Sequence, residues 1–334
     1  MKRRRRLSII LTVAILTLGT AAYAAADRYL IRHVEIADVS SYSTTIQATQ
    51  SIEVPVTEEN QQEASTGISY PSAETTEEAV SIETTYDDWN YRSDTLTISI
   101  NQVISGSGSD TVTYYVADIR ISDATQLQKA FADDQFGRNI TADTSDIAAA
   151  HNAILAINGD YYGFRTDGIV IQNGVIYRDD GTRTGLAFYL DGTMQVYDET
   201  TTTAQELLNA GVWNTLSFGP ALIDDGEFTD ELNTKLVDTN IGNHPISGNQ
   251  PRTGVGIIDE NHYVFIVVDG RSKGYSRGVS MQEFAQIFKD LDCTEAYNSD
   301  GGGSSTMVFM GRLVNLPQGR SNERATSDIL FVTE

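Results

Sequence analysis

The strongest chemical signal in this sequence is an eight-residue segment near its C-terminus. The segment reads Ser299-Asp300-Gly301-Gly302-Gly303-Ser304-Ser305-Thr306. Three adjacent glycines lose much backbone entropy on folding, so an ordered run of them indicates a specific need. The usual need is close approach of the backbone to a ligand, with N–H groups directed at an anion. The run is not a nucleotide-binding P-loop, because no Gly-Lys-Ser/Thr follows it. Strand-like apolar residues on both sides favour a binding segment over a flexible surface loop.

Two other apolar stretches end in the same way, with polar residues next to a glycine. Residues 153–157 run into Asn158-Gly159-Asp160-Tyr161, and residues 264–268 run into Asp269-Gly270. A single Asp-Gly pair is typical of an ordinary turn. Three such ends, one of them with the triple glycine, predict polar groups that converge on one rim of a sheet.

Two arginine segments are candidates for binding an anion. Arg252 and Thr253 precede a predicted strand, and Glu323 and Arg324 lie near the C-terminus. The planar guanidinium fork of arginine suits phosphate or carboxylate. The alternative for each arginine is a surface salt bridge.

Metal and hydrolase motifs of other kinds are missing from the sequence. None of the four histidines forms a metal-spacing pair, and no Gly-x-Ser-x-Gly motif occurs. A hard divalent cation such as calcium or magnesium, held by Asp160, Asp269 or Asp300, stays an alternative because carboxylates suit such ions.

The first 30 residues have the pattern of a signal peptide or a membrane anchor. Lys2 and residues 3–6 form a basic patch, and residues 7–26 carry no charge. Ala22-Tyr23-Ala24 fits a cleavage site, so a cleaved and an uncleaved segment are both open. The basic patch keeps the N-terminus inside. We therefore expect an exported protein, either secreted or membrane-anchored with its catalytic domain outside.

Residues 31–93 have the composition of a disordered acidic stalk rich in Ser and Thr. No Lys or Arg occurs between Arg32 and Arg92, and apolar residues have no period. Such a segment buries too little apolar surface to offset its ordering entropy. The formal net charge of the chain is −23, which argues against nucleic acid as a partner.

The folded domain is expected over residues 94–334, with many hairpins and few helices. Residues 96–100 and 112–121 read as a hairpin, and residues 122–132 and 144–152 as short helices. A capping box, Ser280 with Glu283, begins another helix. Hairpins predominate, so the sequence predicts an α+β domain with a mixed, mostly antiparallel sheet and helices packed on it.

The order of these motifs resembles the phosphodiester glycosidase family over residues 94–334. The resemblance implies that family's fold and the hydrolysis of a glycosyl-1-phosphodiester to free sugar and phosphomonoester. The matching residues are Asn158-Gly159 with Tyr161-Tyr162, Pro251-Arg252-Thr253 with Gly256, Asp269-Gly270, and Asp300-Gly301-Gly302-Gly303-Ser304 with Thr306.

This chemistry needs charge stabilisation for the phosphate and a carboxylate that assists attack at the anomeric carbon. The catalytic candidates are Asp300, Asp269 and Arg252, and the sequence does not assign which aspartate is base or nucleophile. The substrate-binding candidates are Asn158, Gly159, Asp160, Tyr161, Thr253, Gly301, Gly302, Gly303, Ser304, Ser305, Thr306, Glu323 and Arg324.

The export pattern favours a cell-envelope glycan or glycolipid as the substrate. Two alternatives stay open. One is a non-catalytic module that binds envelope glycans, and the other is a metal-dependent phosphodiesterase that cleaves the P–O bond.

Overall fold

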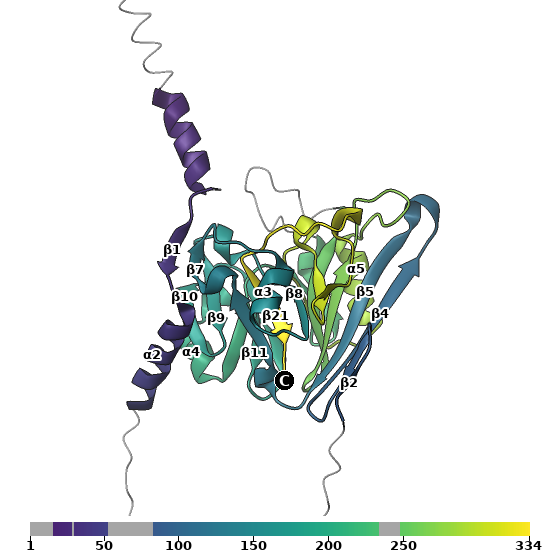
Figure 1. The fold of residues 1–334 in the computed structure, drawn as a ribbon, viewed down its shortest axis with the longest axis horizontal. Helices are drawn as coiled ribbons and strands as arrows, with labels where there is room; N and C mark the ends of the chain where they lie inside the picture. The colour runs from purple at the N-terminus through teal and green to yellow at the C-terminus, as the bar shows by residue number, and fades with distance from the viewer. Residues whose placement is uncertain (1–15, 29, 53–82, 234–247) are drawn as a thin grey trace, which may run out of the picture.

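The computed structural model describes residues 16–28, 30–52, 83–233 and 248–334. Its main feature is a large antiparallel sheet with the order β15-β14-β18-β16-β17-β5-β4-β3-β2 (Figure 1). These strands are β2 (Thr85–Tyr86), β3 (Asn90–Arg92), β4 (Leu96–Ser105), β5 (Val112–Ile121), β14 (Ala221–Asp224), β15 (Glu227–Phe228), β16 (Arg252–Asp259), β17 (His262–Val268) and β18 (Glu295–Asn298).

A second antiparallel sheet, with the order β20-β19-β8-β21-β6, packs against the first. Its strands are β6 (Leu127–Phe131), β8 (Leu155–Asn158), β19 (Met307–Phe309), β20 (Arg312–Leu313) and β21 (Asp328–Val332). The core between the sheets is apolar, and Phe265 and Tyr297 of one sheet share it with Leu155 and Leu330 of the other. Antiparallel strands that bury one face in this way alternate inward and outward side chains.

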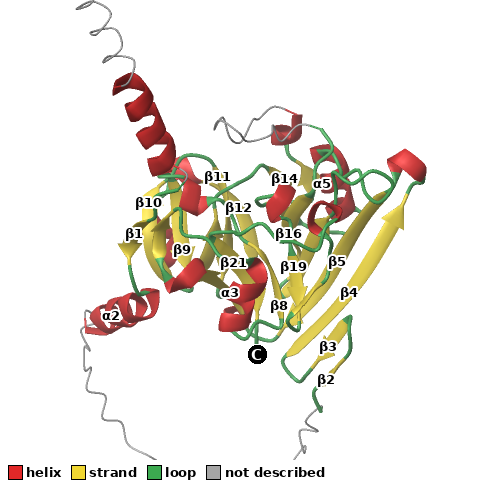
Figure 2. Ribbon diagram, turned by 45° about the horizontal axis from the view of Figure 1, so that its top comes forward, coloured by secondary structure: helices red, strands yellow, loops and turns green. Residues whose placement is uncertain are grey.

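One helix covers the outer face of each sheet, which gives four layers (Figure 2). Helix α5 (Met281–Lys289) packs Phe284 and Phe288 on the large sheet. Its expected capping box is confirmed, because Ser280 accepts a hydrogen bond from the Glu283 N–H and the Glu283 side chain accepts one from Ser280 N–H. Helix α3 (Thr144–Ala150) packs Ile147 on the second sheet. The predicted α+β class with a mostly antiparallel sheet is confirmed.

Smaller elements form one end of the domain. Strands β11 (Thr184–Tyr189), β12 (Met194–Asp198) and β13 (Val212–Leu216) form a three-stranded sheet, and β9 (Gly168–Gln172) pairs with β10 (Val175–Asp180). Helix α4 (Ala204–Asn209) packs Leu207 against Ile169 and Ile171 of β9.

The predicted helix over residues 122–132 is wrong for most of its length. Residues 127–131 form strand β6, which pairs with β21 from Leu127↔Val332 to Phe131↔Asp328. The segment has good helix formers, but pairing with a distant strand overrides that local preference. As a result, Lys129 points into the protein instead of toward solvent and is only 1% exposed.

The disordered stalk predicted for residues 31–93 is contradicted at both of its ends. Strand β1 (His33–Ile36) pairs with β7 (Phe136–Arg138), and helix α2 (Val39–Ile52) follows it. Val39 is buried against Phe131 and Phe136, so this part of the segment does bury apolar surface.

Strands β2 and β3 likewise belong to the large sheet, and buried Tyr91 donates to Glu334 Oε1 at 2.9 Å. The folded part therefore begins before residue 94. The rest of the predicted stalk, residues 53–82, lies outside the described residues.

The N-terminal segment is described only in part. Residues 16–28 are helical, and residues 1–15 of the predicted signal or anchor lie outside the described residues. Within the described parts of the chain, no helix has both the length and the apolar character needed to cross a membrane.

Candidate functional site

Strand ends from both sheets meet at one rim, where the sequence predicts the rim of a single sheet, and Asn158 joins them. Its Oδ1 accepts hydrogen bonds from Thr253 Oγ1 at 2.8 Å and Thr306 N at 3.2 Å. Its Nδ2 donates to the backbone oxygen of Asp300 at 2.7 Å. Asn158 and Thr253 are fully buried, so they position the rim rather than contact a ligand.

Asp300 is the second residue after the end of β18 and is partly open to solvent. Its side chain is 14% exposed, and its Oδ2 lies 3.2 Å from Nη2 of Arg324. Burial raises the pKa of Asp300, while the charges of Arg324 and Arg165 oppose that shift. A partly buried carboxylate with a raised pKa next to cations is a common arrangement for acid–base or nucleophilic catalysis.

Two exposed arginines flank Asp300. Arg324 donates from Nε and Nη2 to Ser304 Oγ, at 3.0 and 2.7 Å, and from Nη2 to the Gly301 oxygen at 3.3 Å. Arg271 is electrostatically coupled to both partners, since its pKa is lowered by lost hydration and by Arg324 and raised by Asp300. Two exposed guanidinium groups on this part of the rim are chemically suited to binding an anion.

Arg271 was not among the predicted site residues, although it directly follows the Asp269-Gly270 motif. Its backbone has a φ of +57°, a left-handed conformation that is uncommon for arginine. Its Nε donates to Gln250 Oε1 at 2.8 Å, which fixes the direction of the side chain. An uncommon backbone conformation held in this way is often found at functional sites.

The three glycines allow close packing of the segment against the rim. A Cβ at Gly301 would lie 2.8 Å from the Pro251 oxygen, and one at Gly302 would lie 3.1 Å from Nη2 of Arg271. Gly302 also has a φ of +66°, which favours glycine. Gly303 is buried, whereas Gly301 and Gly302 are partly exposed next to Asp300.

The later residues of the segment face inward. Ser305 and Thr306 are fully buried, and their hydroxyl oxygens have no hydrogen-bond partner among the described residues. Ser304 is buried too, but its hydroxyl accepts the Arg324 bonds. Of these three predicted binding residues, Ser304 is the one tied directly to the Asp300 site.

Asp269 is surrounded by hydrogen-bond donors. Its carboxylate accepts from Tyr275 Oη at 2.7 Å, Asn315 Nδ2 at 2.8 Å and Leu316 N at 3.0 Å. Burial raises its pKa, and these donors oppose the shift. Asn315 also donates to the Ser305 oxygen at 2.9 Å. This geometry favours a positioning role for Asp269, which fastens the end of the glycine segment.

Arg252 lies behind the exposed arginines. It is 3% exposed and donates to the backbone oxygens of Val279, at 3.3 Å, and Gly248, at 3.0 Å. Burial, with a contribution from Arg271, lowers its pKa to about 10. Arg252 therefore holds loops together beneath the anion site, and Arg271 and Arg324 are better exposed for contact with a phosphate.

Glu323 and Tyr161 lie at the edges of the site. Glu323 accepts a bond from Ser145 N at 3.0 Å and another from the Ser145 hydroxyl, at the N-terminal turn of α3. A carboxylate is favourable there because of the helix dipole. Tyr161 stacks on Phe164, and the Arg165 guanidinium lies 5.3 Å from its ring centroid. Arg165 is a second cation that sequence reasoning missed.

A family model for phosphodiester glycosidases matches residues 151–333, which is more than half of the chain. The chain belongs to the phosphodiester glycosidase family. This match extends from the strand before Asn158 to the last strand, and so includes the whole rim described above.

Relatives of this phosphodiester glycosidase domain come from bacteria and animals. A prophage-derived uncharacterized protein, YomE of Bacillus subtilis, is 30% identical over 66% of this chain and 36% of its own length. The mouse N-acetylglucosamine-1-phosphodiester alpha-N-acetylglucosaminidase is 26% identical over 53% of this chain and 35% of its own. The matches thus span about a third of each relative.

A solved structure has the same fold as this phosphodiester glycosidase domain. It is the catalytic domain of the zebrafish N-acetylglucosamine-1-phosphodiester alpha-N-acetylglucosaminidase, auto-inhibited by its pro-peptide. The TM-score is 0.58 at 22% identity, and the match covers 75% of this chain and 88% of the zebrafish one.

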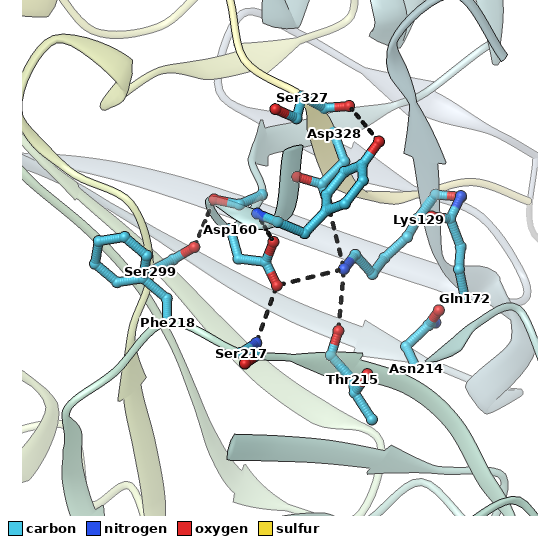
Figure 3. Close-up of polar contacts among 12 residues, drawn as sticks. Lys129, Asp160, Gln172, Asn214, Thr215, Ser217, Phe218, Ser299, Ser327 and Asp328 are labelled. Atoms are coloured by element: carbon cyan, nitrogen blue, oxygen red, sulfur yellow. Dashed lines mark hydrogen bonds and ion pairs between the residues drawn. The ribbon is translucent and has the colours of Figure 1, made fainter. Parts of the chain in front are cut away.

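A buried ionic cluster lies behind the rim of this phosphodiester glycosidase domain (Figure 3). Lys129 Nζ lies 3.0 Å from Asp328 Oδ2 and 3.9 Å from Asp160 Oδ2, and it donates to the Thr215 oxygen at 3.0 Å. A Cβ at Gly159 would lie 2.2 Å from Asp328 Oδ1, so only glycine fits there. Gly159 and Asp160 were predicted to bind substrate, but both are buried against this cluster.

The possible cation site at Asp160, Asp269 and Asp300 is not assembled by the fold. In the described part of this phosphodiester glycosidase, one group of carboxylates comes close enough to share an ion, and it does not include them. Its members are Asp224, Asp225 and Glu295, with ligand atoms within 4.8 Å of one another.

Proposed function

We propose that this protein hydrolyses a glycosyl-1-phosphodiester to free sugar and phosphomonoester, with Asp300 as its central catalytic residue. The observation that carries the proposal is the partly exposed Asp300 carboxylate that pairs with Arg324, with Arg271 packed next to Gly302 of the same segment, in a domain of the phosphodiester glycosidase family.

The arginines suit the leaving group. A phosphate monoester that departs from an anomeric carbon is a weak base, so it needs little help from a general acid. It does need stabilisation of the negative charge that it takes with the bonding electrons. Arg271 and Arg324 are exposed and can direct N–H groups at phosphate oxygens, and the fork of each can bind two oxygens.

Asp300 supplies the complementary function on the sugar side. In its ionised form it takes a proton from water as the water oxygen bonds to the anomeric carbon and the carbon–oxygen bond to phosphate breaks. The charge of Arg324 favours this ionised form and opposes the rise in the pKa of Asp300 that burial causes. Tyr161, stacked on Phe164 beside Arg165, offers an aromatic surface for the sugar.

The proposed substrate is a cell-envelope glycan or glycolipid that carries a sugar-1-phosphodiester. The mouse relative and the zebrafish structure are named for N-acetylglucosamine-1-phosphodiesters, so that sugar is the first to test. An extracytoplasmic location, either secreted or anchored, rests on the basic and apolar pattern of residues 1–26.

The test is an assay of the purified chain on a chromogenic N-acetylglucosamine-1-phosphodiester, with product analysis. We expect free sugar and a phosphomonoester, turnover that survives a chelator, and loss of turnover in Asp300→Asn. Asp180→Asn, which removes an exposed carboxylate on β10, is the matched control. Turnover lost with chelator and restored by metal would favour the phosphodiesterase. Measurable binding without turnover on a panel of sugars would favour the glycan-binding module.

A further inference from the structure

The buried cluster behind Asp300 contains one cation and two carboxyl groups. Lys129, Asp160 and Asp328 are each nearly or fully shielded from solvent, with side chains 0–1% exposed. Figure 3 shows how these side chains point toward one another. If all three were ionised, these three groups would carry one net negative charge in the protein interior, with half-buried Arg178 as a further cation that acts on Asp160. Such a charge is costly, and a buried group usually takes up a proton instead.

The two carboxyl groups differ in the donors that surround them. Asp160 accepts from Tyr162 N and Ser217 N, each at 2.9 Å, in addition to its contact with Lys129. Asp328 has Lys129 Nζ 3.0 Å from its Oδ2, and no other described residue donates a hydrogen bond to either of its carboxyl oxygens. Backbone N–H donors stabilise the ionised form of a carboxyl group, and Asp328 has none.

We propose that Asp328 is a positioning residue that holds a proton in the active protein, so that Lys129 and Asp160 form a charge-balanced pair beneath the catalytic rim. This inference rests on the proposed function for its effect on catalysis. The protonation state itself is independent of what the protein hydrolyses.

The charged and titratable groups that face Asp328 support this assignment. Burial raises the pKa of Asp328 to about 7, Asp160 and Asp300 act in the same direction, and Lys129 opposes them. Tyr162, whose pKa is raised well above its ordinary value by burial, also faces the cluster and stays neutral.

The cluster reaches the catalytic rim through Gly159. The Asp328 carboxyl packs directly on Gly159, whose oxygen accepts bonds from Ser299 Oγ at 2.6 Å and Asn158 Nδ2 at 3.2 Å. Asn158 also holds the backbone of Asp300. Ionisation of Asp328 therefore adds a negative charge just behind a site that binds an anionic substrate, and we expect weaker binding as a result.

The raised pKa of Asp328 also has a predictable effect on the stability of the folded protein. An aspartate with a folded pKa near 7 and an unfolded pKa near ~3.9 binds its proton more tightly when folded. Its stabilising contribution is complete below ~pH 4 and is lost as the pH rises to about 7. Asp328→Asn mimics the protonated carboxyl and should remove this loss.

The experiment compares the full-length wild type, Asp328→Asn and the control Asp180→Asn between pH 5 and pH 9. We expect the melting temperature of Asp328→Asn to increase relative to that of wild type as the pH rises. At pH 8 the melting temperature of the variant should be higher than that of wild type. NMR titration of wild type with ¹³C-labelled aspartate should show one carboxyl titrating near 7 that is missing from Asp328→Asn. In turnover assays, the wild-type KM should rise several-fold between pH 6 and pH 8.5 with a smaller change in kcat.

Two results would overturn the proposal. One is an NMR titration of wild type in which every aspartate titrates below about pH 5. This measurement uses wild type alone, so it is decisive even if Asp328→Asn does not fold. The other is an Asp328→Asn protein that is less stable than wild type at pH 8, as expected for the loss of an ionised partner of Lys129. The NMR titration and the melting temperatures are measured without substrate. They therefore test the protonation of Asp328 independently of whether the proposed hydrolysis is correct.

Discussion

At the scale of residues, similar aspartates at the rim have different roles because their surroundings differ. Asp300 is partly exposed between arginines, Asp269 is buried under three donors, and Asp160 is paired with a buried lysine. A buried carboxylate that already accepts hydrogen bonds from several protein donors is poorly placed to attack or to take a proton from water. Of these three aspartates, Asp300 is therefore the one available for chemistry.

Asp300→Asn should abolish most turnover while the fold is retained. Asn is nearly isosteric but cannot act as a base, and such a loss is typically about 10²–10⁴-fold in kcat. The backbone contact with Asn158 does not depend on the carboxylate. The measurement is kcat beside the melting temperature, and activity within a few-fold of wild type would reject a catalytic Asp300.

Arg271→Lys and Arg252→Lys should differ in what they damage. Lysine at 271 keeps the charge but loses the fork, so we expect a loss of roughly 2–4 kcal/mol of transition-state stabilisation with little change in melting temperature. Lysine at 252 loses bonds to the oxygens of Val279 and Gly248, so we expect a lower melting temperature as well. Measurement of kcat/KM and melting temperature for both variants decides this. Normal kcat/KM in Arg271→Lys would place the phosphate elsewhere.

At the scale of elements, the site depends on how strands end. Strands β8, β16, β17 and β18 each bring a polar residue to the same rim, and the glycine segment closes against the start of β16. The tight approach of Gly301 to the Pro251 oxygen shows that part of the need for glycine comes from packing within the protein.

Gly302→Ala should weaken substrate binding more than it lowers stability. The left-handed φ of +66° costs an alanine roughly 1–2 kcal/mol, and the new methyl group would displace the nearby Arg271 guanidinium. Gly311→Ala is the matched control, because Gly311 has a φ of +74° with nothing within 4 Å of the added methyl. We expect a similar fall in melting temperature in both variants. We expect a raised KM only in Gly302→Ala. Equal KM values in the two variants would contradict it.

At the scale of the whole molecule, the two sheets and two outer helices enclose separate apolar clusters, and N-terminal residues add to them. Tyr91 of β3 is buried in the core between the sheets, and Val39 of α2 packs with Phe131 in another buried cluster. These contacts join the domain to a segment whose composition suggests disorder.

A shortened protein that begins at Asp94 should be less stable than one that begins at Glu83. The shorter protein lacks β2, β3 and Tyr91, and burial of one such side chain contributes about 1.5–3 kcal/mol. The corresponding fall in melting temperature is a few degrees, measured by thermal denaturation of both proteins. Equal melting temperatures would show that the folded domain begins at residue 94, as the sequence predicts.

The sequence by itself determined the family, the α+β class and the convergence of the strand ends at Asn158, Asp269 and Asp300. These features depend on local signals, such as the glycine run, the capping box and polar residues at strand ends, which short stretches of chain encode.

Only the tertiary structure decided which residues share the site and which support it. Residues 122–132 read as a helix, so the inward position of Lys129 appeared only when β6 paired with β21. The surroundings of Arg271, Asp269 and Asp328 are made by segments that lie far apart in the chain. These segments determine the burial, the hydrogen-bond donors and the neighbouring charges of the three residues. No local pattern records such contacts, because the free energy that fixes them belongs to the assembled core.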